Sequence, residues 1–372
     1  MTRLANQHGA INLAQGFPDW EAPAFLRQAA IEAIGVGHDQ YARSPGLPSL
    51  TEAIADDVRA TTGRRPDPEH EVVVGCGATE LIFAAVQALC DVGDEVVLFE
   101  PFYDSYRASV HLAGAIPRPV ALRFPDFTFD PDELRRAFSP RTRMVIVNNP
   151  HNPGGRVWTR AELEAVAALC REHDVVCLAD EVYARLVYEG EHVAIATLDG
   201  MAERTLTLSS LSKTFSATGW RVGWAWGPPA LTAALRLAHQ FVTFSAPTPL
   251  QHAAAVALRH AATSGYYAEL RDGYRQRRDF LVSALTDAGF AVRPPAGAYF
   301  VCAGTDALGR GDDDVALCRW LTERVGVAAI PPSAFCERPE VGRGYVRFVF
   351  CKRDETLAAA AGRLRAIGLK DA

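Results

Sequence analysis

Short apolar runs alternate with longer amphipathic segments through the first two thirds of the chain, and this alternation limits the folds open to it. The segments between the runs, such as 78–90 and 160–173, repeat their apolar positions with helical spacing. The pattern predicts a parallel sheet covered by helices, with ligands bound beyond the carboxyl ends of the strands. The runs are Glu71–Val74, Glu95–Phe99, Met144–Val147, Val175–Ala179 and Thr205–Leu208.

The pattern changes after residue 260. A long charged segment, Tyr267–Ala288, is typical of a helix, and a last helical segment covers Asp354–Ile367. Between them lie short strand-like runs at Ala298–Cys302 and Tyr345–Phe350. We expect a second, smaller α+β domain here, and its boundary rests on pattern alone because no Gly/Ser-rich linker precedes it.

Composition favours a small-molecule partner. The 372 residues carry a net charge of −6 with a pI near 6.0, and the basic residues are scattered, so neither nucleic acid nor a membrane surface is indicated as a partner. No stretch approaches the roughly 18 apolar residues of a membrane span, and the first ten residues lack the apolar centre of a signal peptide. The eight cysteines form no C-x-x-C pair, which favours reduced core thiols and a cytoplasmic protein.

Lys213 is the main candidate for chemistry. It stands in the run Ser209–Arg221, after an apolar segment and among hydroxyl side chains. A lysine amine attacks carbonyls when burial and nearby cations lower its pKa, and the hydroxyls with Arg221 suit a phosphate. Pyridoxal 5'-phosphate is the phosphorylated aldehyde that fits both features. Most lysines in such turns are solvated surface groups, so the assignment depends on four further segments.

The first of these segments, Gly75–Glu80, follows a strand and opens a helix. Small residues at a helix N-terminus expose backbone N–H groups, so a phosphate can bind there and to the Thr79 hydroxyl, with Ser210 and Arg221 joining from elsewhere. A dinucleotide fingerprint is the alternative, but Glu80 stands at its third glycine, and a carboxylate suits a pyrophosphate poorly.

The other three segments lie at further strand ends. Tyr103, two residues after Pro101, can stack on a flat cofactor ring. Asn152 lies in a rigid turn with two prolines and two glycines, which can aim its amide at a phenolate oxygen. Asp180 can keep a pyridine nitrogen protonated, and Tyr183 can donate to the same oxygen as Asn152. Each residue alone has an ordinary structural explanation, but their combination favours the cofactor.

This set of segments resembles the class I and II pyridoxal-phosphate aminotransferases of fold type I, over nearly the whole chain. Within that family it is most similar to the branch of kynurenine aminotransferases, glutamine transaminase K and bacterial methionine aminotransferases. The motifs that carry the likeness are Gln15-Gly16-Phe17-Pro18-Asp19, Asp39-Gln40-Tyr41, His239-Gln240 with Thr243-Phe244-Ser245, Ile330-Pro331-Pro332-Ser333-Ala334-Phe335, and Tyr345-Val346-Arg347-Phe348. The resemblance implies an α/β large domain over residues 20–260, with a mostly parallel seven-stranded sheet between helices, and a smaller α+β domain of residues 1–19 and 261–372.

The resemblance also implies roles for single residues. Lys213 forms the Schiff base with the cofactor and moves the Cα proton, with Asp180 and Tyr183 completing the catalytic group. Arg347 holds the substrate carboxylate, to which a planar guanidinium is suited. The cofactor-binding residues are Gly77, Ala78, Thr79, Tyr103, Asn152, Asp180, Tyr183, Ser210, Lys213, Arg221 and Tyr41. The substrate-binding residues are Gly16, Asn152, Arg347, Phe17, Trp20 and Phe244. No metal is expected, and Tyr41 and Phe244 are expected to reach the partner's site in a homodimer.

The implied activity moves the α-amino group of an L-amino acid to a 2-oxo acid by a ping-pong mechanism. Aspartate-type relatives carry a side-chain-binding arginine where this chain has Phe244 and Ser245. Together with Phe17 and Trp20, this favours a neutral, apolar or aromatic substrate of the methionine, phenylalanine, tyrosine, kynurenine or glutamine type.

Three alternatives stay open. A cysteine-S-conjugate or cystathionine β-lyase would use the same cofactor and release pyruvate and ammonia without an acceptor. Succinyl-diaminopimelate aminotransferases, which take an acidic substrate, share the run Gln15–Pro18. A non-catalytic regulator that senses a ligand would be expected to carry an added DNA-binding domain.

Overall fold

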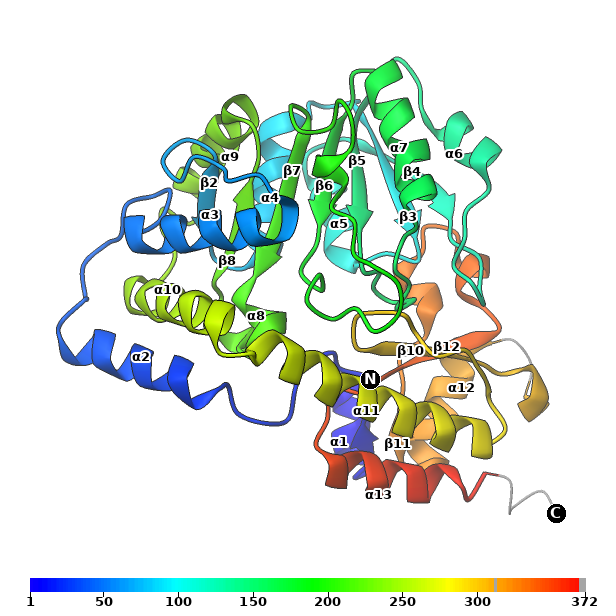
Figure 1. Ribbon diagram of the computed structural model, residues 1–372. Helices are drawn as coiled ribbons and strands as arrows, with labels where there is room; N and C mark the ends of the chain where they lie inside the picture. The colour runs from blue at the N-terminus through cyan, green and yellow to red at the C-terminus, as the bar shows by residue number, and fades with distance from the viewer. Residues whose placement is uncertain (311–312, 368–372) are drawn as a thin grey trace.

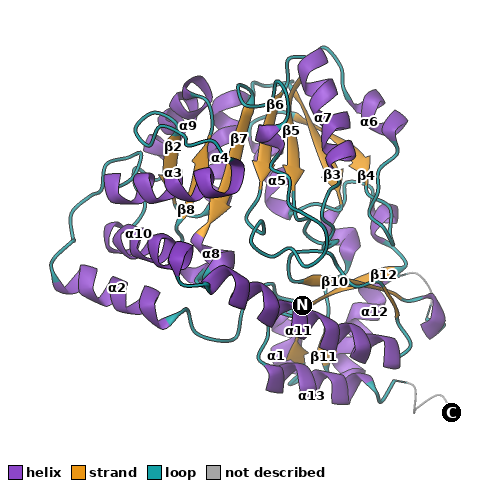
Figure 2. Ribbon diagram, viewed as in Figure 1, coloured by secondary structure: helices purple, strands orange, loops and turns teal. Residues whose placement is uncertain are grey.

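The computed structural model describes residues 1–310 and 313–367. Residues 311–312 and 368–372, which belong to the predicted smaller domain, lie outside the described residues. A large sheet with its helices forms the upper part of the molecule in Figure 1, and a smaller group of strands and helices lies below it. Figure 2 shows that helices flank the large sheet.

The large sheet has seven strands in the order β2-β8-β7-β6-β5-β3-β4. Of these seven, β8 runs antiparallel to both neighbours, and the other six share one direction. The strands are β2 (Val72–Gly75), β3 (Glu95–Glu100), β4 (Ile116–Ala121), β5 (Thr142–Asn148), β6 (Val176–Asp180), β7 (Thr205–Ser210) and β8 (Gly223–Trp226). The expected α/β fold with a mostly parallel sheet is confirmed, and the five strands predicted from apolar runs are all present.

Two strands of this sheet, β4 and β8, are not indicated by the sequence pattern. Pro117 and Pro119 interrupt the strand signal of β4, but this strand lies at the sheet edge, where residues without an N–H are tolerated. The strand β8 has only four residues, and its two tryptophans are buried. Two of its residues are Gly223 and Ala225, which have low strand propensity, so the local pattern does not mark it as a strand.

Alternate side chains of the strands pack against helices on opposite faces of the sheet. Val96 and Leu98 of β3 join one core cluster, and Val97 and Phe99 join another. The first face is covered by α4 (Ala78–Leu89), α5 (Asp104–Leu112) and α9 (Pro229–Val242), and the second by α6 (Pro131–Ala137) and α7 (Arg160–Glu172). A third cluster joins β2 and β8 to α2 (Ala24–Gly35), α3 (Pro48–Thr62) and α10 (Thr248–Thr263).

Local sequence signals fix several helix ends. Thr159 and Glu162 form a capping box at the start of α7, in which each side chain bonds the other residue's backbone N–H. The helix α3 ends at Gly63, which has a φ of 78°. Glycine adopts this left-handed conformation without steric cost, so it stops the helix cleanly.

The smaller group of elements contains an antiparallel sheet of three strands and a two-stranded parallel ladder. Its strands are β9 (Ala291–Val292), β10 (Phe300–Gly304) and β12 (Tyr345–Val349), with β1 (Ile11–Asn12) beside β11 (Val327–Ala328). Its helices are α1 (Thr2–Gln7), α11 (Tyr266–Asp287), α12 (Asp314–Trp320) and α13 (Asp354–Leu364). The β1–β11 ladder joins the first residues to the C-terminal third. The limits at residues 20 and 260 stay a prediction.

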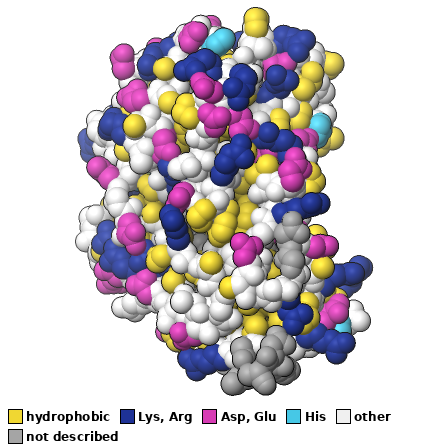
Figure 3. Space-filling model, turned by 90° about the vertical axis from the view of Figure 1, so that its right-hand side faces the viewer, with side chains coloured by type: hydrophobic (Ala, Val, Ile, Leu, Met, Phe, Trp, Pro, Cys, Tyr) yellow, Lys and Arg dark blue, Asp and Glu magenta, His cyan; other side chains and the backbone are white. Residues whose placement is uncertain are grey.

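The cysteines are reduced, as the sequence predicts. All eight cysteines carry free thiols, and seven of them are buried. Basic and acidic side chains are interspersed over the face drawn in Figure 3. Within residues 1–310 and 313–367, the structure has no helix with the length and apolar character needed to cross a membrane.

Candidate active site

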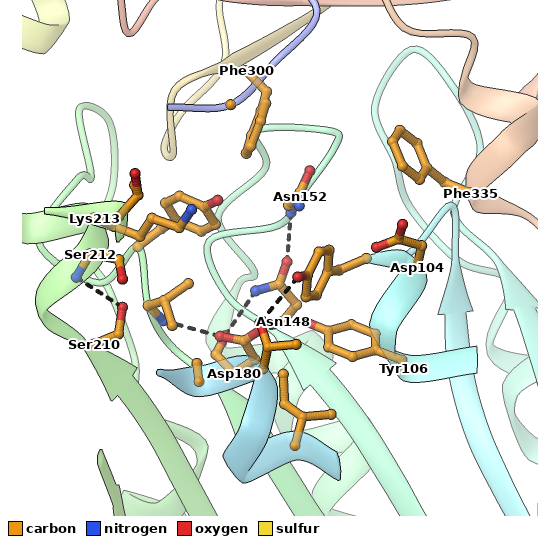
Figure 4. A pocket seen from close by; sticks show the side chains of 18 of the residues that line it. Asp104, Tyr106, Asn148, Asn152, Asp180, Ser210, Ser212, Lys213, Phe300 and Phe335 are labelled. Carbon is orange, nitrogen blue, oxygen red and sulfur yellow. Dashed lines mark hydrogen bonds between the residues drawn. The ribbon is translucent and has the colours of Figure 1, made fainter. Parts of the chain in front are cut away.

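A cavity of about 310 Å³ lies at the carboxyl ends of the parallel strands. Asn148, Asp180 and Ser210, which end β5, β6 and β7, line it from the large sheet, and Phe300 lines it from β10 (Figure 4). Arg347 lines it from β12. Neighbouring parallel strands end at the same edge of a sheet, which brings their terminal residues together. The sequence-predicted residues that line it are Gly16, Ala78, Thr79, Tyr103, Asn152, Asp180, Tyr183, Ser210, Lys213, Arg221 and Arg347.

One end of the cavity is built to hold an anion. The helix α4 begins at Ala78 without a side-chain cap on its first N–H groups, and Arg221 lies beside the preceding Gly77. A Cβ at Gly77, whose φ is 80°, would meet the Arg221 guanidinium, so only glycine fits there. The hydroxyls of Thr79 and Ser210 line the same cavity. Helix N–H groups, hydroxyls and a guanidinium fit the phosphate of a phosphorylated cofactor.

Lys213 lies on the short helix α8 (Leu211–Thr214), directly after β7. Ser210 accepts a hydrogen bond from the Ser212 N–H at 3.2 Å and so fixes the start of this helix. The Lys213 Nζ lies 5.7 Å from the ring centre of Tyr183 and 5.6 Å from that of Tyr299. Burial lowers the pKa of Lys213 to about 8, and the charges of Arg221 and Arg347 act in the same direction. More of this amine is therefore neutral near physiological pH than in an exposed lysine, and the neutral form is able to attack a carbonyl.

Asp180 is a buried carboxylate with two donors. The Tyr106 hydroxyl donates to Oδ2 at 2.6 Å, and the Val182 N–H donates to Oδ1 at 3.3 Å. The Asn148 amide donates to the Asp180 backbone carbonyl at 2.9 Å and ties the ends of β5 and β6 together. Burial raises the pKa of Asp180, while the Tyr106 hydrogen bond and the Lys213 charge oppose that rise. A buried carboxylate of this kind favours a cationic partner in the cavity, such as a protonated ring nitrogen.

Arg347 lies on the opposite wall, in β12. Its Nη2 donates to the Ala14 carbonyl at 2.9 Å and its Nη1 donates to the Asn152 Oδ1 at 3.0 Å. Phe300 flanks the guanidinium, with its ring centre 4.5 Å from Cζ. The buried Nε atom has no hydrogen-bond partner. A guanidinium held in place with an unused donor suits a carboxylate ligand.

Tyrosines form the rest of the wall. The Tyr103 hydroxyl lies 3.2 Å from the Thr79 Oγ1, which places the ring beside the anion-binding end. Tyr183 is buried, and burial raises the pKa of its hydroxyl, which therefore stays protonated and able to donate. The Tyr299 hydroxyl donates to the Gly16 carbonyl at 2.5 Å and fixes the segment that closes the cavity from the N-terminal side.

Five predicted residues do not line the cavity of this chain: Gly77, which lies beside Arg221 just before α4, and Phe17, Trp20, Tyr41 and Phe244. Phe17 is half-exposed and lies against Lys352, 4.6 Å from Nζ to the ring centre. The Trp20 indole N–H donates to the Ser216 hydroxyl at 3.1 Å, which turns the ring away from the cavity. Tyr41 is 84% exposed and packs edge-on against Phe244. The predicted roles of these five residues in binding stay predictions.

Several lining residues are not among the predicted ones. Tyr106 and Asn148 hydrogen-bond to Asp180. In the sequence only their positions could have indicated them: Tyr106 follows Tyr103 by about one helical turn, and Asn148 is the last residue of an apolar strand. Sequence spacing does not reveal which carboxylate a tyrosine will meet. The remaining unpredicted lining residues are Gln15, Ile82, Asp104, Val182, Ser212, Thr218, Phe300, Ile330 and Phe335.

Comparison with known proteins finds similarity to aminotransferases along nearly the whole chain. The sequence model of the family described as Aminotransferase class I and II matches residues 8–364. The chain is 46% identical to a probable N-succinyldiaminopimelate aminotransferase of Mycobacterium tuberculosis, covering 100% of this chain and 96% of the relative. It is 41% identical to the methionine aminotransferase of Escherichia coli, covering 98% and 94%.

A solved structure of the N-succinyldiaminopimelate aminotransferase from Mycobacterium tuberculosis superposes with a TM-score of 0.95, at 47% identity and with 99% and 96% of the two chains covered. The resemblance drawn from the motifs is confirmed, and so is the fold. The chain belongs to the class I and II aminotransferases and is an enzyme that uses pyridoxal 5'-phosphate to transfer amino groups.

Proposed function

We propose that this enzyme transfers the α-amino group of an L-amino acid with a neutral, apolar or aromatic side chain to a 2-oxo acid, in two half-reactions at one site. The observation that carries the proposal is the wall around Arg347, where Phe300, Ile330 and Phe335 line the cavity. Apolar walls favour apolar side chains, since an unpaired carboxylate there would lose its hydration.

Charge on the cavity wall supports the same choice. Of the described residues that line the cavity, the cationic ones are Lys213, Arg221 and Arg347, and each has a proposed role in binding or proton transfer. Asp104 adds a carboxylate to the wall. A second substrate carboxylate would meet this like charge without a cation of its own, which disfavours an acidic side chain.

The roles of the residues follow from their positions. The N-terminus of α4, Ser210 and Arg221 would hold the cofactor phosphate, and Asp180 would pair with the pyridine nitrogen. Tyr103 would flank the ring, while Asn152 and Tyr183 would donate to its oxygen. When bound, pyridoxal phosphate supplies an electron sink for the bond that breaks at the substrate Cα.

The chain's own groups orient the substrate and move the proton. Arg347 would bind the α-carboxylate with two parallel donors, which fixes the direction of the Cα–H bond. Lys213, buried and with a pKa of about 8, can accept the Cα proton as a neutral amine and deliver it to a neighbouring carbon. Phe300 and the buried tyrosines keep water away from that step.

A single-amino-acid titration tests the proposal. The absorbance of the bound cofactor should change when methionine, phenylalanine or glutamine is added alone, and should return when a 2-oxo acid follows. Aspartate should give a far weaker change. Release of pyruvate and ammonia from an S-substituted cysteine, without any oxo acid, would instead support a β-lyase.

The second candidate is an N-succinyldiaminopimelate aminotransferase. It is favoured by the 46% identity over the whole chain to a protein with that probable activity. Its acidic substrate would need cations beyond those lining the cavity of one chain. Faster turnover of the succinylated substrate than of methionine would decide for this candidate.

We also propose that the enzyme is a cytoplasmic homodimer. Exposed apolar side chains support the dimer: Tyr41 and Phe241 are each 84% exposed, and Leu237 is 65% exposed. Tyr41 and Phe244 would then reach the partner's site. Eight free thiols are in keeping with a reducing compartment. Light scattering at several concentrations tests the oligomeric state.

A further inference from the structure

Glu80 stands in the first turn of α4, beside the anion-binding end of the cavity. A free carboxylate at that place would compete with a bound anion for the helix N–H groups. Its side chain instead turns back along the chain, and Oε2 accepts the Cys76 N–H at 3.1 Å. The Arg221 Nη2 donates to the Cys76 carbonyl at 3.4 Å. The backbone just before Gly77 is therefore held at both its N–H and its carbonyl.

The second carboxylate oxygen of Glu80 meets a buried histidine. His239, in the last turn of α9, has no exposed surface, and its Nδ1 lies 3.0 Å from the Glu80 Oε1. Its Nε2 lies 3.1 Å from the Ser44 backbone carbonyl. A carbonyl oxygen only accepts, so Nε2 must carry a hydrogen. The contact between Nδ1 and Oε1 then needs a second proton, and with it the pair as a whole is neutral.

His239 also connects this contact to two other segments. Its backbone carbonyl accepts the N–H groups of Thr243 and Phe244, at 2.9 and 3.1 Å, and so closes the end of α9. Phe244, with a φ of 73°, packs against Tyr41 at 5.1 Å between ring centres. The histidine thus links the backbone of the phosphate-binding turn to the segments around residues 41–44 and 243–244.

We infer that Glu80 and His239 are positioning residues for the cofactor phosphate. Their shared proton neutralises the carboxylate beside the phosphate site, and the pair fixes the Cys76 backbone that leads into it. Both residues act through the turn at Cys76 and Gly77. The inference rests on the proposed place of the phosphate at the N-terminus of α4.

The test compares Glu80→Ala, Glu80→Gln and His239→Ala in the full-length protein. The dissociation constants of pyridoxamine 5'-phosphate and of pyridoxamine, which lacks the phosphate, are measured for each variant. The alanine variants should bind the phosphorylated compound about tenfold more weakly, as expected for the loss of hydrogen bonds to a charged group, with little change for pyridoxamine. Glu80→Gln should stay close to wild type, because its amide oxygen can accept the Cys76 N–H and its NH₂ can donate to Nδ1.

Three results would overturn the inference. Unchanged pyridoxamine phosphate binding in Glu80→Ala removes the positioning role. An equal loss for pyridoxamine and its phosphate means that the pair only supports the fold, and a loss in Glu80→Gln as large as in Glu80→Ala removes the shared proton. If His239→Ala does not fold, the two Glu80 variants still decide. If the wild type does not prefer the phosphorylated compound, the proposed phosphate site itself is wrong.

Discussion

Tyr106 offers the sharpest single test of how the site controls charge. Its hydroxyl donates the 2.6 Å hydrogen bond to Asp180, and both side chains are buried. Tyr106→Phe removes this donor and leaves the ring in place. A hydrogen bond to a charged group contributes roughly 1.5–3 kcal/mol. Since about 1.4 kcal/mol corresponds to one pKa unit, the pKa of Asp180 should rise by about one to two units in the variant.

The Tyr106 hydrogen bond favours the charged form of Asp180, and this decides in which direction the activity of the variant changes with pH. Tyr106 and Lys213 oppose the rise in the pKa of Asp180 that burial causes, so losing Tyr106 lets the carboxyl hold its proton to higher pH. A neutral Asp180 cannot pair with a cationic ring nitrogen. The acid limb of the kcat/KM profile should therefore move to higher pH by about one to two units, while the rate at alkaline pH changes less.

The pH profile of kcat/KM and the absorbance of the bound cofactor over the same pH range measure this shift. Tyr103→Phe is the matched control, because it also removes a tyrosine hydroxyl from the cavity wall. The Tyr103 hydroxyl contacts Thr79, whereas the Tyr106 hydroxyl contacts Asp180. Its acid limb should stay at the wild-type position. An unshifted acid limb in Tyr106→Phe would refute the assignment of Asp180 to the ring nitrogen.

Three further predictions follow from the site. Lys213→Ala should abolish turnover with unchanged circular dichroism, and borohydride reduction of the wild type should place the cofactor mass on the Lys213 peptide; substantial activity in the variant would remove its proposed role. Arg347→Ala should raise KM for amino acids by about a hundredfold, from a lost bidentate charged contact, with the cofactor still bound in a spectrum; unchanged amino-acid kinetics would contradict the carboxylate assignment. Gly77→Ala should weaken cofactor binding, measured by equilibrium dialysis, because its Cβ would displace Arg221; wild-type affinity would show that the phosphate lies elsewhere.

Sequence pattern predicts the central strands of this fold well, and the reason is burial on both faces. The strands β3 and β6 are buried at every position. Apart from Glu95, Glu100 and Asp180 at their ends, they appear as uninterrupted apolar runs. The edge strand β4 is partly exposed and contains two prolines, and β8 contains a glycine and an alanine among its four residues. These two strands are set by pairing with their neighbours, which a local pattern does not contain.

In the candidate site too, residues that a local sequence pattern marks could be predicted, and residues placed by tertiary packing could not. Lys213, Asp180 and Asn152 lie at or just after strand ends, and topology alone brings strand ends to one place. Tyr106 acts through its contact with Asp180, which lies 74 positions away in the chain. His239 acts through its contact with Glu80, which lies 159 positions away. Such pairings depend on the packing of α5 and α9 against α4 and the sheet, so no spacing rule could reveal them. Trp20 is a residue that the sequence suggests for the site but that packing places elsewhere: its indole N–H donates to Ser216, and its ring lies outside the cavity.

The arrangement of charge around Lys213 connects substrate binding to proton transfer. Burial is the main cause that lowers the pKa of Lys213, and the charges of Arg221 and Arg347 lower it further. A carboxylate bound at Arg347 would offset one of these charges, and a phosphate at Arg221 would offset the other. The pKa of the amine should therefore rise as ligands fill the two ends of the cavity. Lys213 therefore has a larger neutral fraction when it must attack a carbonyl, and it becomes a stronger base once a bound amino acid presents its Cα proton.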